Sequence, residues 1–238
     1  MNYRNIIYEK YPQFKGCKEA NFLQTTEQLA KYLAILLGGI LPPDKGTLCL
    51  DCGCGNGAFL FMLKSLGYEN ILGVDLSPGQ IVSAKKLSLP VEEGDIFNFL
   101  RSKENSFGLI SALDLVEHLT KEEIFDLLAL IKKALIPGGI FLGRTPNGAS
   151  PLAGSILWGD FTHETVFTPG SMNQVLLASG FQELSFFEQK PLPLGPVSAL
   201  RAVFWQFARL FYKFLDGVEG GGWGRPILSQ VFWFRAVK

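Results

Sequence analysis

The sequence predicts a single α/β domain, residues 1–238, with a doubly wound and mostly parallel sheet between two layers of helices. Short apolar runs of strand length alternate with helical stretches, which is the pattern of repeated strand-helix-strand units. A chain of 238 residues with 47% hydrophobic residues is also long and apolar enough for one sizeable core, and short for two domains. We therefore expect a three-layer αβα domain.

Seven strands are expected, with the sequences TLCLDC, NILGVDL, LPVEEGD, FGLISALDL, GIFLGRT, FQELSFFEQ and PILSQVFWFRAVK. The intervening helices are expected at 25–36, 58–65, 77–87, 120–135 and 168–180. Capping boxes at Thr25 and Thr120 and a serine N-cap at Ser77 mark where three of them begin. An N-terminal helical cap at 1–45 and a helical insertion at 190–225 complete the predicted domain.

The composition favours a cytoplasmic protein that acts on a small molecule. Lysine plus arginine equals aspartate plus glutamate, 22 each, so no net field attracts nucleic acid, and the N-terminus lacks the apolar run of a signal peptide. The four cysteines, Cys17, Cys49, Cys52 and Cys54, suit a reducing compartment. A metal site is not expected, because a second CxxC is missing and the chain has two histidines.

The strongest local motif is the sequence LDCGCGNG at the end of the first strand, with Gly53, Gly55 and Gly57. Glycines at the carboxyl end of a parallel strand let the backbone turn sharply and let a ligand touch the main chain. The spacing is GxGxG, unlike the dinucleotide fingerprint, and Asp51 precedes the first glycine. A carboxylate there repels a pyrophosphate and attracts a cofactor that carries an ammonium and a sulfonium group.

Two further carboxylates end the second and third strands. Asp75 follows the last glycine by 18 residues, which is a position from which a carboxylate can accept both hydroxyls of a ribose. Asp95 ends the third strand. A capping or turn aspartate is the structural alternative at each position. Three carboxylates at successive strand ends nevertheless favour one ligand site at this edge of the sheet.

Together, the motifs LDCGCGNG, GVDLSP, EEGDIF, FGLISALDLVEHL and LIPGGIFLGRTPN resemble the class I S-adenosylmethionine-dependent methyltransferases over about residues 24–190. The resemblance implies a Rossmann-like sheet whose last strand is antiparallel and lies beside the fifth strand. It also implies a methyltransferase that binds S-adenosylmethionine. The donor-binding positions that it implies are Asp51, Gly53, Cys54, Gly55, Gly57, Asp75, Leu76, Asp95, Ile96, Asp114 and Leu115.

The segment from DLVEHL to DFTHETVFTPGSMNQ is similar to a branch that methylates ubiquinone precursors and sugars of cell-surface glycans. In that branch Asp160 and His163 would line the acceptor side. A hydroxyl acceptor must lose its proton, and His163 or His118 is the expected base because imidazole titrates near neutral pH. Each histidine has a structural alternative, ordering a loop for His163 and capping a short helix for His118.

Two other functions remain open from the sequence. A nicotinamide-dependent oxidoreductase would share the sheet and Asp75, but it should show GxGxxG after the first strand, where this chain has GxGxG. A non-catalytic protein that binds S-adenosylmethionine or acts as a scaffold would keep the fold and lose cofactor contacts.

The segment 197–215 is expected to form an amphipathic helix that covers the acceptor pocket. Its apolar face comprises Leu200, Val203, Phe204, Phe207, Leu210, Phe211 and Phe214, and its polar face carries Arg201, Arg209 and Lys213. Packing on the domain itself, a homodimer contact and peripheral contact with a membrane would each bury the apolar face.

Overall fold

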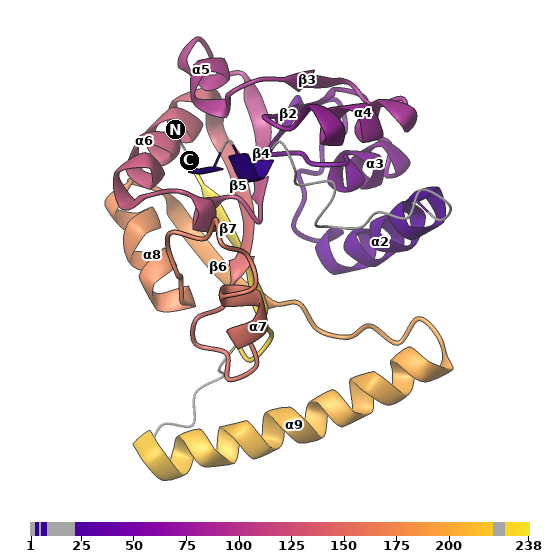
Figure 1. The fold of residues 1–238 in the computed structure, drawn as a ribbon, viewed down its shortest axis with the longest axis vertical. Coiled ribbons are helices and arrows are strands. Elements are labelled where there is room, and N and C mark those ends of the chain that lie inside the picture. Colours follow the sequence, from indigo (N-terminus) through magenta and orange to yellow (C-terminus); the bar gives the residue numbers. More distant parts are fainter. Residues whose placement is uncertain (1–2, 5, 9–21, 221–226) are drawn as a thin grey trace.

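A seven-stranded sheet forms the body of the molecule in a computed structural model that describes residues 3–4, 6–8, 22–220 and 227–238 (Figure 1). The strands are β1 (Cys49–Cys52), β2 (Ile71–Asp75), β3 (Val91–Glu93), β4 (Phe107–Leu113), β5 (Leu135–Pro146), β6 (Gln182–Glu188) and β7 (Val231–Val237). Their order is β3-β2-β1-β4-β5-β7-β6, and β7 runs antiparallel to both of its neighbours while the other pairs are parallel. The predicted fold class is confirmed.

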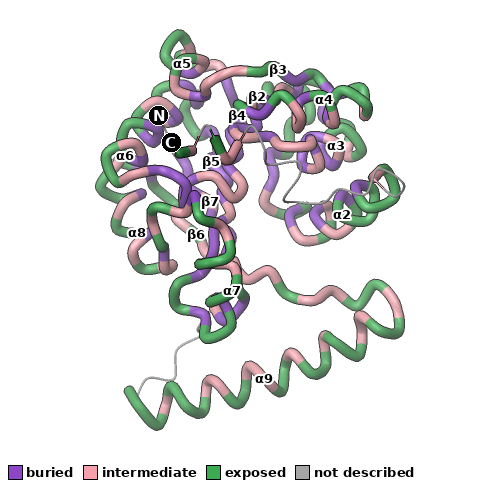
Figure 2. Tube along the Cα trace, in the orientation of Figure 1, coloured by how far each residue is buried: buried purple, intermediate pink, exposed green. Residues whose placement is uncertain are grey.

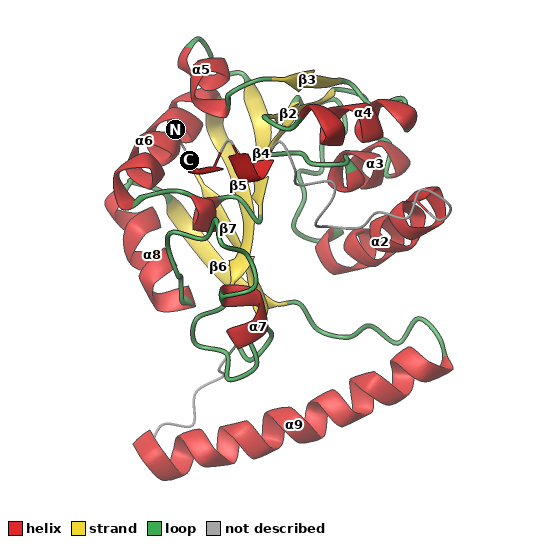
Figure 3. Cartoon of the chain, viewed as in Figure 1, coloured by secondary structure: helices red, strands yellow, loops and turns green. Residues whose placement is uncertain are grey.

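Helices cover both faces of the sheet (Figure 3). They are α2 (Phe22–Leu37), α3 (Ala58–Ser65), α4 (Pro78–Lys86), α5 (Ile96–Arg101), the 3₁₀ helix η2 (Val116–His118), α6 (Lys121–Ala134), α7 (Gly154–Leu157), α8 (Pro169–Ala178) and α9 (Pro196–Gly220). One core lies between the sheet and α2, α3 and α4, and the other between the sheet and α5, α6 and α8. In β7, Trp233 packs into the first core while Phe232 and Phe234 pack into the second, as alternation along a strand requires.

The helix starts show which capping predictions were right. Thr120 caps α6 with a full capping box, in which its hydroxyl accepts the N–H of Glu123. The prediction at Thr25 was wrong because α2 begins at Phe22, and the hydroxyl of Thr26 donates to the carbonyl of that residue. Ser77 precedes α4, but its side chain makes no capping hydrogen bond.

The helix α9 stands apart from the body and leaves the apolar face exposed (Figure 2). The Arg209 guanidinium of this helix lies 3.5 Å from the Glu188 carboxylate at the end of β6. The apolar side chains of the stripe are 54–63% exposed. Of the three alternatives for this stripe, packing on its own domain is therefore not what the structure shows. No helix in the described ranges is long and apolar enough to cross a membrane.

Some sequence-based expectations fall outside the described residues. These are Cys17, most of the N-terminal cap before Phe22, and positions 221–226 of the predicted insertion.

Candidate active site

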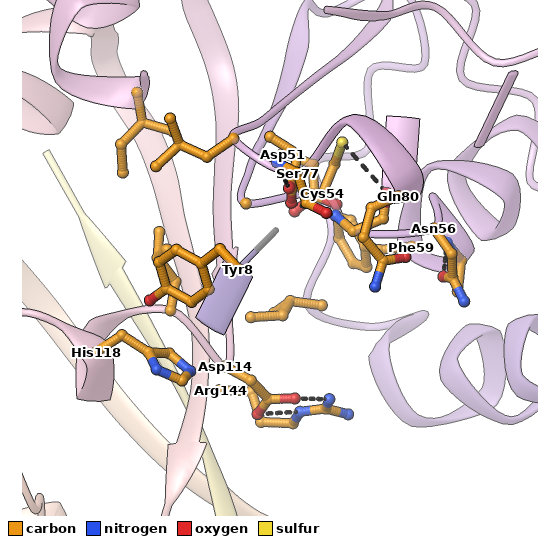
Figure 4. A pocket seen from close by; sticks show the side chains of 18 of the residues that line it. Tyr8, Asp51, Cys54, Asn56, Phe59, Ser77, Gln80, Asp114, His118 and Arg144 are labelled. Carbon is orange, nitrogen blue, oxygen red and sulfur yellow. Dashed lines mark hydrogen bonds and ion pairs between the residues drawn. The ribbon is translucent and has the colours of Figure 1, made fainter. Parts of the chain in front are cut away.

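A cavity of about 570 Å³ opens at the carboxyl ends of β1, β2 and β4 (Figure 4). Its wall combines the glycine loop after β1, the end of β2, the start of α5 and the end of β4, with contributions from α2 and the N-terminal residues. The volume falls in the range of small-molecule and cofactor sites. The position, at the edge where the strand order reverses, is where open parallel sheets bind ligands.

The backbone of the glycine loop has φ angles that residues other than glycine adopt only with strain. Gly53, Gly55 and Gly57 all have positive φ, of 69°, 52° and 82°. A Cβ on Gly57 would also lie 2.5 Å from Leu89, so this position lacks both the conformation and the space for a side chain. Cys54, between the first two glycines, is buried and packs against Gly73 of β2. The loop therefore presents main chain to the cavity.

Asp75 fastens this loop to the end of β2. Its carboxylate accepts the N–H of Gly55 and the N–H of Ser77, each at 2.8 Å. The capping alternative for Asp75 is thus partly correct, but each oxygen keeps a second lone pair directed to further donors. The Ser77 hydroxyl lines the same cavity, is buried, and has no partner among the described residues. Both groups are available to a ligand with hydroxyl groups.

Asp51 is a buried carboxylate in the wall of the cavity, with 2% of its surface exposed. It accepts a 2.7 Å hydrogen bond from the Ser111 hydroxyl, and within the described residues no cation forms an ion pair with it. Burial raises the pKa of Asp51 to about 7. A ligand that carries a positive charge would compensate this buried carboxylate.

The third carboxylate lies at the start of α5. Asp95 caps this helix through a 2.9 Å bond from the N–H of Asn98, so the predicted alternative of a capping aspartate holds for one oxygen. Ile96 and Leu76 also line the cavity, and Leu76 is 52% exposed. These apolar side chains provide a surface on which a planar ring could pack.

Asp114 is occupied by an ion pair that the sequence analysis did not anticipate. Its two carboxylate oxygens accept hydrogen bonds from Nε and Nη2 on one edge of the Arg144 guanidinium, and Nε lies 3.0 Å from Oδ1. The Arg144 guanidinium also lies over the Trp233 ring, 5.3 Å from its centre. Asp114 has a positive φ of 52°, a strained value for a residue other than glycine. Leu115, next to it, packs against Gly53.

A second cavity, of about 380 Å³, lies beyond this ion pair. Asp114, Arg144 and His118 line both cavities, whereas Glu117 and His163 line only the second. The two imidazole rings lie 4.7 Å apart, centre to centre. Glu117 is buried, and its pKa is raised by that burial and by the negative charge of Asp114. The structure thus gathers both predicted histidines at one place.

Several cavity residues were given no site role from the sequence, and Arg4, Tyr8, Glu117 and Arg144 are among them. Arg144 had a usable signal, since a cation near the carboxyl end of an apolar strand is costly without a function or a partner. Arg4 and Tyr8 had none, because their position depends on contacts such as the ion pair between Arg4 and Glu123 of α6. The two cavities contain no residue of α9, so the prediction that this helix covers the acceptor pocket was wrong.

Comparisons with known proteins support a methyltransferase. Residues 50–143 match the family model of a methyltransferase domain. The chain is 31% identical to 2-methyl-6-phytyl-1,4-hydroquinone methyltransferase of Synechocystis over 44% of this chain and 34% of that protein. It is 28% identical to the ribosomal protein L11 methyltransferase of Thermosipho africanus over 51% of this chain and 46% of that protein. The chain thus spans less than half the length of either curated relative.

The fold is similar to that of a solved structure, a SAM-dependent methyltransferase from Archaeoglobus fulgidus, with a TM-score of 0.67 and 21% identity. The similarity covers 98% of this chain and 99% of that one. The shared architecture therefore extends beyond the segment that the family model matches.

The buried Asp51 makes the ligand-free protein less stable as the pH rises. Its folded-state pKa of about 7 exceeds the ordinary value of 3.8, so the folded chain holds this proton more tightly than the unfolded chain does. Stability should fall between about pH 4 and pH 7, and Asp51→Asn should remove that part of the decline. Urea unfolding at pH 5 and pH 8 measures it, with the exposed Asp126→Asn as control. An unchanged pH dependence in Asp51→Asn would contradict the assignment.

Proposed function

We propose that the chain, whose residues 50–143 match a methyltransferase family model, is an active class I S-adenosylmethionine-dependent methyltransferase that methylates a hydroxyl group of a small molecule. The observation that carries the proposal is the pairing of two adjoining cavities. The first offers groups for a nucleoside and for a cation. The second offers a histidine cluster suited to a hydroxyl acceptor.

The residues of the first cavity fit S-adenosylmethionine. Asp75 has lone pairs for the ribose hydroxyls, and the unpaired Ser77 hydroxyl lies beside it. Asp51 is a buried carboxylate that the ammonium group would neutralise. Apolar side chains near Asp95 provide a wall for the adenine. When bound, the cofactor supplies a methyl group that its sulfonium already activates.

The second cavity supports an acceptor with a hydroxyl group. Transfer to an alcohol or phenol requires removal of its proton, whereas the alignment of donor and acceptor in a site without water provides much of the remaining rate. This cavity is lined by Glu117, His118 and His163. The imidazole groups of the two histidines are of the kind that removes such a proton. The balanced net charge of the chain argues against a nucleic acid as acceptor.

The exposed stripe of α9 supports an acceptor carried at a lipid surface. This stripe contains three phenylalanines within eight residues, Phe204, Phe207 and Phe211, and all are more than half exposed. The basic residues Arg201 and Lys213 flank it on the helix, which is the pattern of helices that lie in a membrane interface. We propose that α9 rests on anionic lipid and brings the active site to a quinone precursor or a lipid-linked sugar.

Replacing Asp75 by alanine should weaken binding of S-adenosylmethionine at least about tenfold. The substitution removes acceptors for two hydroxyl groups, and hydrogen bonds to charged groups contribute about 1.5 to 3 kcal/mol each before water compensates. Calorimetry with the donor measures the effect, and Glu93→Gln, at the exposed end of β3, is the control. Unchanged affinity, or tight binding of NAD by the parent, would overturn the assignment of this cavity.

Asparagine in place of His118 or His163 should slow methyl transfer by about a hundredfold or more in at least one variant, with donor affinity intact. The assay is transfer of a labelled methyl group to quinone precursors, nucleotide sugars and lipid-linked sugars. If neither variant is slower, the acceptor is an amine, a carboxylate or a carbon atom. If the parent binds the donor and no acceptor class is methylated, a non-catalytic binding protein is the better conclusion.

The membrane role of α9 predicts that the protein sediments with anionic vesicles at low salt and dissociates as salt increases. The double variant Phe207→Glu/Phe211→Glu should lose this binding, because it places two charges in the apolar stripe. Gln206→Glu, on the polar face, is the control. A parent protein that ignores vesicles and forms a dimer that the double variant cannot form would assign the stripe to a second copy of the chain.

A further inference from the structure

Glu117, His118 and His163 lie at the centre of the acceptor side, and their possible ligand atoms lie within 4.8 Å of one another. We propose that these three side chains bind a divalent transition-metal ion. The site deepens the proposed function, because it would hold the acceptor oxygen beside the donor cavity. The sequence did not predict this site, because a second CxxC is missing and the two histidines stand 45 positions apart in the chain, where each fits a separate base.

The first support is a carboxylate oxygen that is buried and unpaired. Glu117 is 2% exposed, and its Oε2 accepts a 3.0 Å hydrogen bond from the Thr145 hydroxyl. Its Oε1 has no hydrogen-bond partner among the described residues. Such a buried acceptor is costly to leave unsatisfied, and a bound ion is one of the few ways to satisfy it. The Glu117 carboxylate contributes one oxygen to the group of three ligand atoms.

The second support is the orientation of the two imidazoles. The Nδ1 of His163 lies 3.0 Å from the carbonyl oxygen of Leu157, so it must carry the proton and donate it. The Nδ1 of His118 lies 2.8 Å from the Thr162 hydroxyl, and that hydroxyl lies 2.6 Å from the Asp160 carboxylate. A hydroxyl has one proton and gives it to the carboxylate, so Nδ1 of His118 also donates.

When Nδ1 carries the proton in a neutral imidazole, Nε2 has the lone pair. In both rings Nε2 is therefore the nitrogen that would bind the metal. A backbone carbonyl or a carboxylate-linked hydroxyl behind each ring is the arrangement that orients metal-binding histidines. Ligand atoms around a transition metal lie about 3 to 4.4 Å apart, so shifts of a few tenths of an ångström would close the present group on an ion. Two histidines and one carboxylate leave open positions, which is the ligand set of sites that bind substrate.

The long-range contacts of this site explain why the three ligands meet. Glu117 and His118 lie on η2, directly after β4, whereas His163 lies in the loop between α7 and α8. The N–H groups of Glu164 and Thr165 donate to the carbonyl of Glu117, at 2.8 and 3.0 Å. This loop is therefore held against η2 by backbone hydrogen bonds, and the ligands do not depend on exposed side chains to stay together.

A metal at this place would change how the acceptor loses its proton. A hydroxyl oxygen that binds a divalent cation becomes more acidic, so its proton passes to solvent more easily and the oxygen remains bound as the nucleophile. His118 and the Asp114–Arg144 ion pair line both cavities, so an ion held here would lie next to the donor site. His118 and His163 would then act as ligands, and their loss would slow methyl transfer through loss of the ion.

Titration of the purified full chain with Mn²⁺, followed by the electron paramagnetic resonance signal of the free ion, tests the site. We expect one saturable site per chain, and competition by Co²⁺ and Zn²⁺. Glu117→Gln, which keeps the shape of the side chain, and His163→Asn should each weaken binding at least about tenfold. Glu122→Gln, on the exposed face of α6, is the matched control.

Calorimetry with S-adenosylmethionine and circular dichroism are measured on the same proteins, to separate the two proposals. Intact donor binding without saturable binding of Mn²⁺, Co²⁺ or Zn²⁺ would overturn the metal site alone. Undiminished Mn²⁺ affinity in a folded Glu117→Gln or His163→Asn would also overturn it. A parent chain that binds metal and not the donor would overturn the proposed function and leave the metal site standing.

Discussion

The active site depends on one constraint, that β1, β2 and β4 are parallel neighbours and end at the same edge of the sheet. The chain continues from β1 to β2 and β3 on one side and returns to β4 on the other side of β1. The connections that follow β1 and β4 therefore leave in opposite directions, and a crevice remains between them. The Asp75 carboxylate then joins the glycine loop to the end of β2 through the N–H of Gly55. Every donor-side contact proposed above follows from this arrangement of backbone.

The proposed acceptor side depends on a different kind of contact. It forms where the loop between α7 and α8 bonds to the backbone of η2, and where the Asp114–Arg144 ion pair joins the ends of β4 and β5. These contacts join segments that are 30 or more residues apart. A variable loop can therefore alter the acceptor site while the donor site, built on strand ends, stays constant. This division is consistent with relatives that act on a hydroquinone and on a ribosomal protein.

The exposed apolar stripe of α9 is energetically unfavourable for the isolated chain in water. Full burial of a large apolar side chain is worth about 1.5 to 3 kcal/mol, and the stripe leaves seven such side chains more than half exposed. Exposed apolar surface of this extent is characteristic of a surface that meets a partner or a lipid. Arg209 pairs with Glu188 of the body, while the apolar stripe stays exposed.

The sequence by itself determined the features that rest on local chemistry. Alternation of apolar runs and capping signals predicted the strands and the start of α6 at Thr120, and glycine spacing predicted the loop at Gly53 to Gly57. The carboxylates Asp51, Asp75 and Asp95 could be placed at one edge because parallel strands bring their carboxyl ends together. The capping box at Thr25 failed because this residue lies inside α2, which already includes Phe22.

Only the tertiary structure decided how distant segments meet. The pairing of Asp114 with Arg144, the cluster of Glu117 with both histidines, and the approach of Arg4 to α6 join residues with no common local pattern. Periodicity likewise showed that α9 has two faces, but only the structure shows that the apolar stripe stays exposed. Local propensity acts over one or two turns of chain, whereas these contacts follow from the packing of the complete sheet and its connections.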